Sequence, residues 1–118
     1  MPKTPTRGNP GDDLPVGVRD AVTATLEPEE RIERHVPVVG AHLILTGRRL
    51  FVVRHGYDYR PATGIRGWPL DSHLLLRIEP GHLQIEARGT RVVVLYHAPQ
   101  AVAIRSLVAA ARRASGPP

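Results

Sequence analysis

The stretch HLILTGRRLFVVR, residues 42–54, decides the fold that this sequence predicts. Two apolar runs flank a short turn at Gly47-Arg48, and two such runs around a glycine turn are typical of a β-hairpin. We therefore expect antiparallel strands over residues 42–46 and 49–54.

Short apolar stretches separated by glycine and proline turns continue on both sides of this hairpin. Upstream, the segment 32–39 is expected to be a strand, and Pro37 indicates a sheet edge or a bulge. Downstream, we expect one short irregular strand within 57–68, then strands over 74–79, 82–86 and 91–96. Six or seven antiparallel strands twist too strongly to lie flat, so the sequence predicts that they curl into a partial barrel or a sandwich.

Two amphipathic helices are expected at the two ends of this strand-rich region. The first covers residues 13–26, is capped by Asp13, and has an apolar stripe of Leu14, Val18, Ala21, Val22 and Leu26. The second begins near Pro99, and its apolar face consists of Ile104, Leu107, Val108 and Ala111. The C-terminal helix is expected to close one open end of the barrel. The N-terminal helix either packs on the side of the barrel or docks on another subunit, and both alternatives stay open.

The length and composition bound the class of protein. The 118 residues suit one domain, expected over 13–114, with disordered tails at 1–12 and 115–118. The chain has no cysteine, which excludes disulfides and thiolate metal sites. No apolar run approaches the roughly 20 residues that span a bilayer, and the N-terminal residues do not resemble a secretion signal. We expect a cytoplasmic protein, and its net charge of +5 makes anionic partners worth considering.

Three segments carry a resemblance to a known family. They are Leu26-Glu27-Pro28-Glu29-Glu30, the run from Leu43 to Val52 with its Leu-Thr-Gly-Arg-Arg-Leu core, and Trp68-Pro69-Leu70 followed by residues 74–78. Over about residues 26–113 the chain resembles bacterial pleckstrin-homology (PH) and GRAM-like domains. The resemblance implies a PH-like fold in which Arg49 is typical of the fold rather than of a ligand site. Some relatives bind inositol phosphates through basic residues around the first hairpin, but residues 35–42 contain no lysine or arginine, so we expect no conventional phosphoinositide site.

Catalytic and metal-binding patterns are weak. After Glu33 the carboxylates are Asp58, Asp71, Glu79 and Glu86, and no nucleophile, phosphate-loop or dinucleotide motif accompanies them. We therefore expect no enzyme, no cofactor and no small-molecule substrate. Six histidines fall mostly at strand ends without the spacing of a metal site, so none is predicted; His35 and His42 are the best pair if any bind.

Two candidate binding surfaces follow from these patterns. The first is a basic patch with interleaved aromatic residues: Arg48, Arg54, Tyr57, Tyr59, Arg60 and Arg66. The second is a partner interface made by the N-terminal helix and the first strand: Leu14, Val18, Val22, Val36 and Val38. The function that we expect is that of a non-catalytic binding or scaffold module in protein–protein assembly. Its partner is another protein, and self-association with a second copy of the chain is one form of this assembly. The alternative is peripheral, weak binding of anionic membrane lipid or nucleic acid through the arginines.

Overall fold

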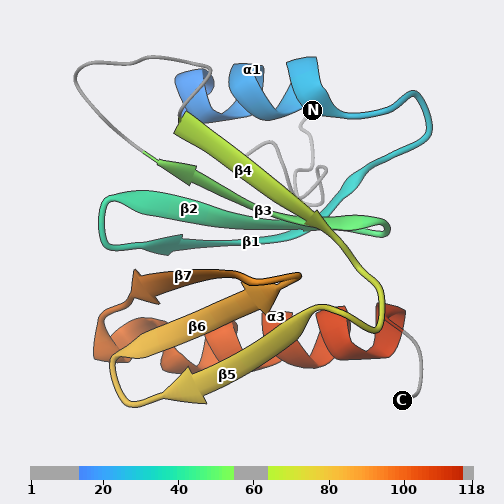
Figure 1. Cartoon of the computed structure of the whole chain (residues 1–118). Helices are drawn as coiled ribbons and strands as arrows, with labels where there is room; N and C mark the ends of the chain where they lie inside the picture. Colours follow the sequence, from blue (N-terminus) through green and yellow to red (C-terminus); the bar gives the residue numbers. More distant parts are fainter. Residues whose placement is uncertain (1–13, 55–63, 116–118) are drawn as a thin grey trace, which may run out of the picture.

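The computed structural model describes residues 14–54 and 64–115, which form seven strands and two α-helices (Figure 1). In chain order the elements are α1 (Val16–Thr25), β1 (Ile32–Val38), β2 (Ala41–Thr46), β3 (Arg49–Arg54), β4 (Ile65–Pro69), β5 (Leu75–Glu79), β6 (His82–Ala87), β7 (Thr90–Leu95), the short 3-10 helix η2 (Ala98–Gln100) and α3 (Ala101–Ala114). The predicted mainly β fold with a helix near each end is confirmed.

The strands form two antiparallel sheets, one with the order β1-β2-β3-β4 and one with the order β5-β6-β7. The prediction of antiparallel pairing is confirmed. Of the two forms expected for the strands, the partial barrel is not the one observed, because no ladder joins β4 to β5 within the described ranges and the strands form two separate sheets. Pro69 ends β4, and the turn after it leads the chain into the second sheet. A backbone hydrogen bond from Val39 N to Leu95 O (2.9 Å) links the two sheets at one corner.

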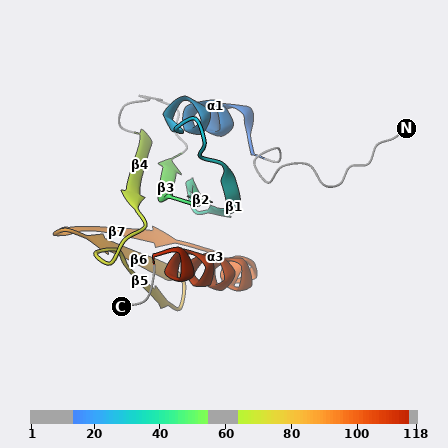
Figure 2. The same cartoon turned by 90° about the vertical axis from the view of Figure 1, so that its right-hand side faces the viewer.

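The first apolar core lies between the two sheets and α3 (Figure 2). Leu43 and Leu50 enter it from the first sheet, Leu83 and Ile85 enter it from the second, and all four are fully buried. The predicted apolar face of the C-terminal helix completes this core with Ile104, Leu107, Val108 and Ala111. The C-terminal helix α3 therefore covers the apolar side chains that the two sheets leave exposed between them.

A second apolar core lies on the opposite face of the four-stranded sheet, under α1 (Figure 1). Val18 and Val22 pack there against Ile44, Phe51 and Val53. Of the two alternatives for the N-terminal helix, the structure shows the one in which it packs on its own chain. Because both faces of β2 and β3 are covered, their runs are apolar without alternation.

Two predicted boundaries differ from the structure. The N-terminal helix begins at Val16 with the extended Pro15 as its N-cap, whereas the predicted cap, Asp13, lies outside the described residues. The irregular strand expected within 57–68 is β4, which pairs in regular register with β3 from Arg49↔Pro69 to Val53↔Ile65. The predicted tails fall almost wholly on residues 1–13 and 116–118, which lie outside the described residues as well.

Candidate functional site

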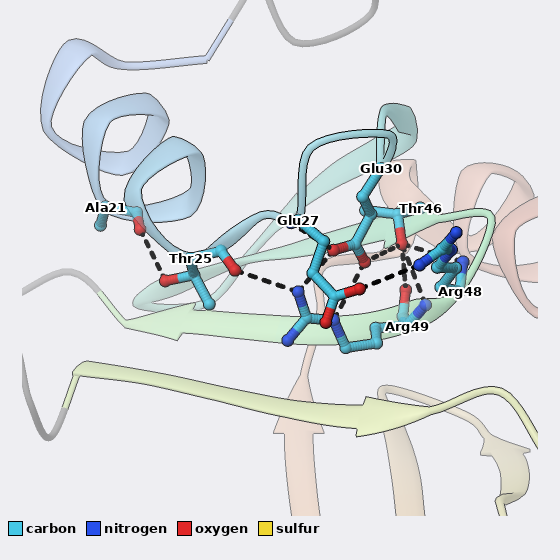
Figure 3. A network of polar contacts seen from close by, with 7 residues as sticks. All are labelled: Ala21, Thr25, Glu27, Glu30, Thr46, Arg48 and Arg49. Carbon is cyan, nitrogen blue, oxygen red and sulfur yellow. Dashed lines mark hydrogen bonds and ion pairs between the residues drawn. The ribbon is translucent and has the colours of Figure 1, made fainter.

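A polar network around Glu30 joins the loop after α1 to the β2–β3 hairpin (Figure 3). The Glu30 side chain is fully buried, and its Oε2 accepts hydrogen bonds from Arg49 Nε (3.0 Å) and Thr46 Oγ1 (2.7 Å). Its Oε1 accepts from Arg49 Nη2 and from the backbone N of Glu27 (3.1 Å). The Arg49 side chain thus meets the Glu30 carboxylate with two nitrogens, the paired geometry that suits a guanidinium.

Thr46 and Arg49 extend this network into the backbone. Thr46 Oγ1 accepts hydrogen bonds from the backbone N of Arg48 (3.1 Å) and of Arg49 (2.9 Å), which shapes the hairpin turn. Arg49 Nη2 also donates to Thr25 O (3.0 Å) at the end of α1, and its guanidinium carbon lies 4.7 Å from the centre of the Phe51 ring. Arg49 therefore holds α1, the following loop and β3 together.

Protonation of Glu30 is strongly disfavoured in the folded chain. The hydrogen bonds from Arg49, followed by those from Thr46 and from Glu27 N, lower the pKa of Glu30 from 4.5 to about 2, although burial opposes this shift. The same contact with Glu30 raises the pKa of Arg49. All of these partners lie within the chain, so the network fastens the loop after α1 and the end of α1 to the β2–β3 hairpin.

Among the described residues of the predicted basic patch, Arg48 lies apart from Arg54. Arg48 lies in the β2–β3 turn, where it forms ion pairs with Glu27 (2.9 Å) and Glu29 (3.8 Å) that offset its charge. Arg54 lies at the other end of β3, roughly 20 Å away at the usual rise per residue of a strand.

Arg54 and Arg66 are the two predicted patch residues that remain near each other. Both are exposed, and the register of β3 with β4 places them diagonally on one face of the sheet. Neither has a carboxylate within ion-pair distance among the described residues. Arg66 lies over Trp68, with 5.7 Å between the guanidinium carbon and the ring centre. Tyr57, Tyr59 and Arg60 lie outside the described residues.

The predicted partner interface lies inside the chain instead. Three of its residues lie in the core between α1 and the first sheet and are at most 7% exposed: Leu14, Val18 and Val22. The other two, Val36 and Val38, lie in the core between the two sheets and are at most 8% exposed. The expectation that these five side chains form a partner interface is therefore corrected, because all five are packed inside the two apolar cores of the chain.

The structure instead exposes apolar side chains on a surface that the sequence reasoning did not single out. Leu75, Val93 and Leu95 are 60%, 48% and 54% exposed on the side of the second sheet that faces away from the core. Figure 1 shows that neither helix covers this side. We call it the outer face, and the strand registers build it from three rows: Leu75–Glu86–Arg91, Arg77–Gln84–Val93 and Glu79–His82–Leu95.

A signal for the outer face is present in the sequence. Strand β7 has a nearly continuous apolar run, Val92 to Tyr96, like those of β2 and β3. Such runs are typical of strands covered on both faces. Strand β7 is covered on one, and the other half of its run is left exposed.

The outer face carries charges of both signs in equal number. Arg91 Nε donates to Glu86 Oε2 at 2.8 Å across two neighbouring strands. Arg77 and Glu79 lie two residues apart on β5, so the face holds two arginines and two carboxylates. Its local formal charge is zero with neutral His82, although the whole chain carries +5.

A hollow of about 430 Å³ lies beside β5 and the end of α3, and Asp71 and Arg112 are among the residues that line it. Asp71 on its rim accepts hydrogen bonds from the backbone N of His73 (2.9 Å) and from Arg88 Nη2 (3.1 Å). These contacts lower the pKa of Asp71 and hold its carboxylate in the turn before β5. Arg112 Nη2 donates to Leu76 O (2.7 Å) across the same hollow.

The two histidines named as the best metal pair lie near each other on the first sheet. The ring centres of His35 and His42 are 6.0 Å apart, and the two residues lie on neighbouring strands. Within the described part of the chain, no three histidine or carboxylate side chains are grouped as a metal site would require. The pair therefore supports no metal assignment.

Comparisons with known proteins add no family assignment: no family model, curated protein or solved structure matches this chain. In the described residues, neither helix is long and apolar enough to cross a membrane.

Proposed function

We propose that this chain is a PH-like, non-catalytic binding module of the cytoplasm that docks another protein on its outer face. The observation that carries the proposal is the exposure of Leu75, Val93 and Leu95 on one side of a sheet. The two sheets and the buried C-terminal helix support the PH-like part, since they fit the outline that the resemblance implies. A chain without cysteine fits the cytoplasm.

The contrast between the two sheets supports docking at this face. The first sheet has apolar side chains on both faces, and α1 covers the one that faces away from the core. The second sheet has apolar side chains on both faces of β7 but no helix of its own on the outer side. Large aliphatic side chains gathered on one face favour a contact with another molecule, because covering them removes apolar surface from water.

Position-specific cross-linking tests this proposal. A photo-reactive amino acid at Leu75 is expected to capture a protein in extract of the native cells, whereas the same probe at Val102 is expected to capture none. Val102 is the matched control because it is 68% exposed but lies on α3, away from the outer face. Equal capture at both positions, or none at Leu75, contradicts the proposal.

A second candidate function is supported by Arg54 and Arg66. Two exposed arginines on one face, with no carboxylate beside them among the described residues, suit a phosphate-bearing surface. This candidate corresponds to a peripheral binder of anionic membrane lipid or nucleic acid. It ranks second because Glu27 and Glu29 offset the charge of Arg48. Of the described patch residues, two arginines are then left, whereas tight binding of phosphates needs several donors.

A further inference from the structure

We propose that the partner of the outer face is a second copy of this chain, and that the two copies pack face to face about a two-fold axis. This inference rests on the proposed function, because it names the protein that docks there. A two-fold contact requires one patch that is complementary to itself. The charges of the outer face favour such a partner, the edges of the sheet direct it to the face, and the size of the face sets how tightly it binds.

The charge pattern favours a second copy over a partner of one sign. The outer face holds Arg77 and Arg91 together with Glu79 and Glu86. A strongly acidic or strongly basic partner would bring like charges against two of these four side chains. Arg91 already pairs with Glu86 inside the chain, so Arg77 and Glu79 are the charges left for a partner. A second copy carries the same two side chains, and a two-fold axis lets Arg77 of each copy meet Glu79 of the other.

The edges of the second sheet direct a partner to the face rather than to the side. At the β7 edge, Leu95 O already accepts a hydrogen bond from Val39 N (2.9 Å). At the β5 edge, Leu76 O already accepts one from Arg112 Nη2 (2.7 Å). Both edges carry a contact within the chain that interrupts the row of free backbone groups needed by an added strand. The exposed outer face remains, and two sheets pack well about 10 Å apart with their strands nearly aligned.

The size of the outer face predicts weak association. Three strands about 4.8 Å apart, with five residues each rising about 3.3 Å, give a footprint of roughly 250 Å² per copy. This is well below the roughly 800 Å² of a standard interface, so we expect a dissociation constant of about 0.1 to 1 mM. The dimer should therefore form only at high protein concentration.

Sedimentation velocity over a concentration series tests the pairing with three chains. The wild-type protein is expected to shift from monomer to dimer as its concentration rises through about 0.1 to 1 mM. Val93→Glu is expected to weaken the dimer at least about tenfold, because a two-fold contact counts each substitution twice. Val93→Thr keeps the β-branched shape that suits a strand, so this variant is expected to fold. It should also weaken the dimer, and a weaker dimer in this variant shows that the effect of Val93→Glu is not due to misfolding. Val102→Glu, an equally drastic change on α3, is expected to leave the dimer unchanged.

The outcomes separate this inference from the proposed function. A wild-type protein that stays monomeric throughout, or a dimer that Val93→Glu leaves intact, overturns self-pairing through this face. Cross-linking of the purified protein from Leu75 is expected to give a product of twice the chain mass. If that product is absent while Leu75 captures a different protein in extract, self-pairing is wrong and docking stands. If Leu75 captures nothing in either setting, both are wrong.

Discussion

The Glu30 carboxylate accepts four hydrogen bonds from three residues. These bonds give a structural reason for the polar residues within the segments that resemble PH and GRAM-like domains. Glu30 belongs to one of those segments, and Thr46 and Arg49 belong to another, 16 and 19 residues later. The sequence predicted that Arg49 is typical of the fold, but its partner is set by a contact between distant segments. A pattern of residue types along the chain contains no information on that pairing.

The pKa of Glu30 makes folding stability depend on pH. Its folded pKa, about 2, is below the ordinary 4.5, so the stabilisation is fully present above about pH 4.5 and is lost as the pH falls through 2. The shift corresponds to about 3 kcal/mol. We expect Glu30→Gln to lower the free energy of unfolding by about 3 kcal/mol at pH 7, and the gap from wild type to shrink between pH 5 and pH 2. Chemical denaturation at a series of pH values measures both.

The neighbouring carboxylate provides the control for this measurement. Glu29 has a side chain that is 83% exposed, and its distance to Arg48 is 3.8 Å. Glu29→Gln should change the free energy of unfolding by less than about 0.5 kcal/mol at any of these pH values. An equal effect of the two variants would refute the structural role of the buried carboxylate.

The strands and helices could be predicted where turn residues and apolar alternation agree. The hairpin of β2 and β3 and the strand pair β5–β6 fit this description, and their predicted positions match the structure. Strand β4 was expected to be irregular because proline and glycine residues break the segment 57–68. In the structure Gly67 pairs opposite Phe51 in regular register, where its lack of a side chain makes room for the ring. Glycine here is a packing feature, which a local reading of turn residues takes for a break.

The close approach of Phe51 to Gly67 predicts a destabilising substitution. A Cβ atom at position 67 would lie 2.7 Å from Phe51 Cε1 and 2.8 Å from Cδ1, and the ring is almost fully buried. We expect Gly67→Ala to lower the free energy of unfolding by about 1 to 3 kcal/mol, measured by urea denaturation. Gly17→Ala is the matched control, because it meets nothing within 4 Å in α1 and should raise stability by about 0.5 to 1 kcal/mol. Two variants of equal stability would contradict this account of β4.

At the scale of the molecule, the two cores decide which residues are available to partners. The sequence predicted an apolar stripe on α1 but left open what it covers, and it named that stripe as an interface. The outer face escaped prediction because the run from Val92 to Tyr96 indicates apolar side chains on both faces of the strand but not that one of these faces is left uncovered. Which face is left bare depends on where the chain places its helices, and that is a property of the whole arrangement.

The second candidate function makes its prediction at the same scale. A chain of net charge +5 is attracted to any anionic surface at low salt, so a specific contribution must be separated from that background. If Arg54 and Arg66 bind phosphates, Arg54→Gln with Arg66→Gln should reduce co-sedimentation with phosphatidylserine vesicles, and retention on mixed oligonucleotides, more than Arg105→Gln with Arg113→Gln does. The control pair removes the same charge from the exposed side of α3. Equal losses in the two double variants would leave net charge as the whole explanation.

The contacts at the edges of the second sheet have a consequence for aggregation. The segment Val92-Val93-Val94-Leu95-Tyr96 is uncharged, free of proline and glycine, and rich in β-branched residues, which is the composition of segments that stack into amyloid. In the folded chain Val39 occupies one backbone acceptor of this segment, and the Tyr96 hydroxyl donates to Glu79 O (2.9 Å). The bond from Val39 occupies backbone that an added strand would need, so we expect the turn after β1 to matter to solubility as well as to shape.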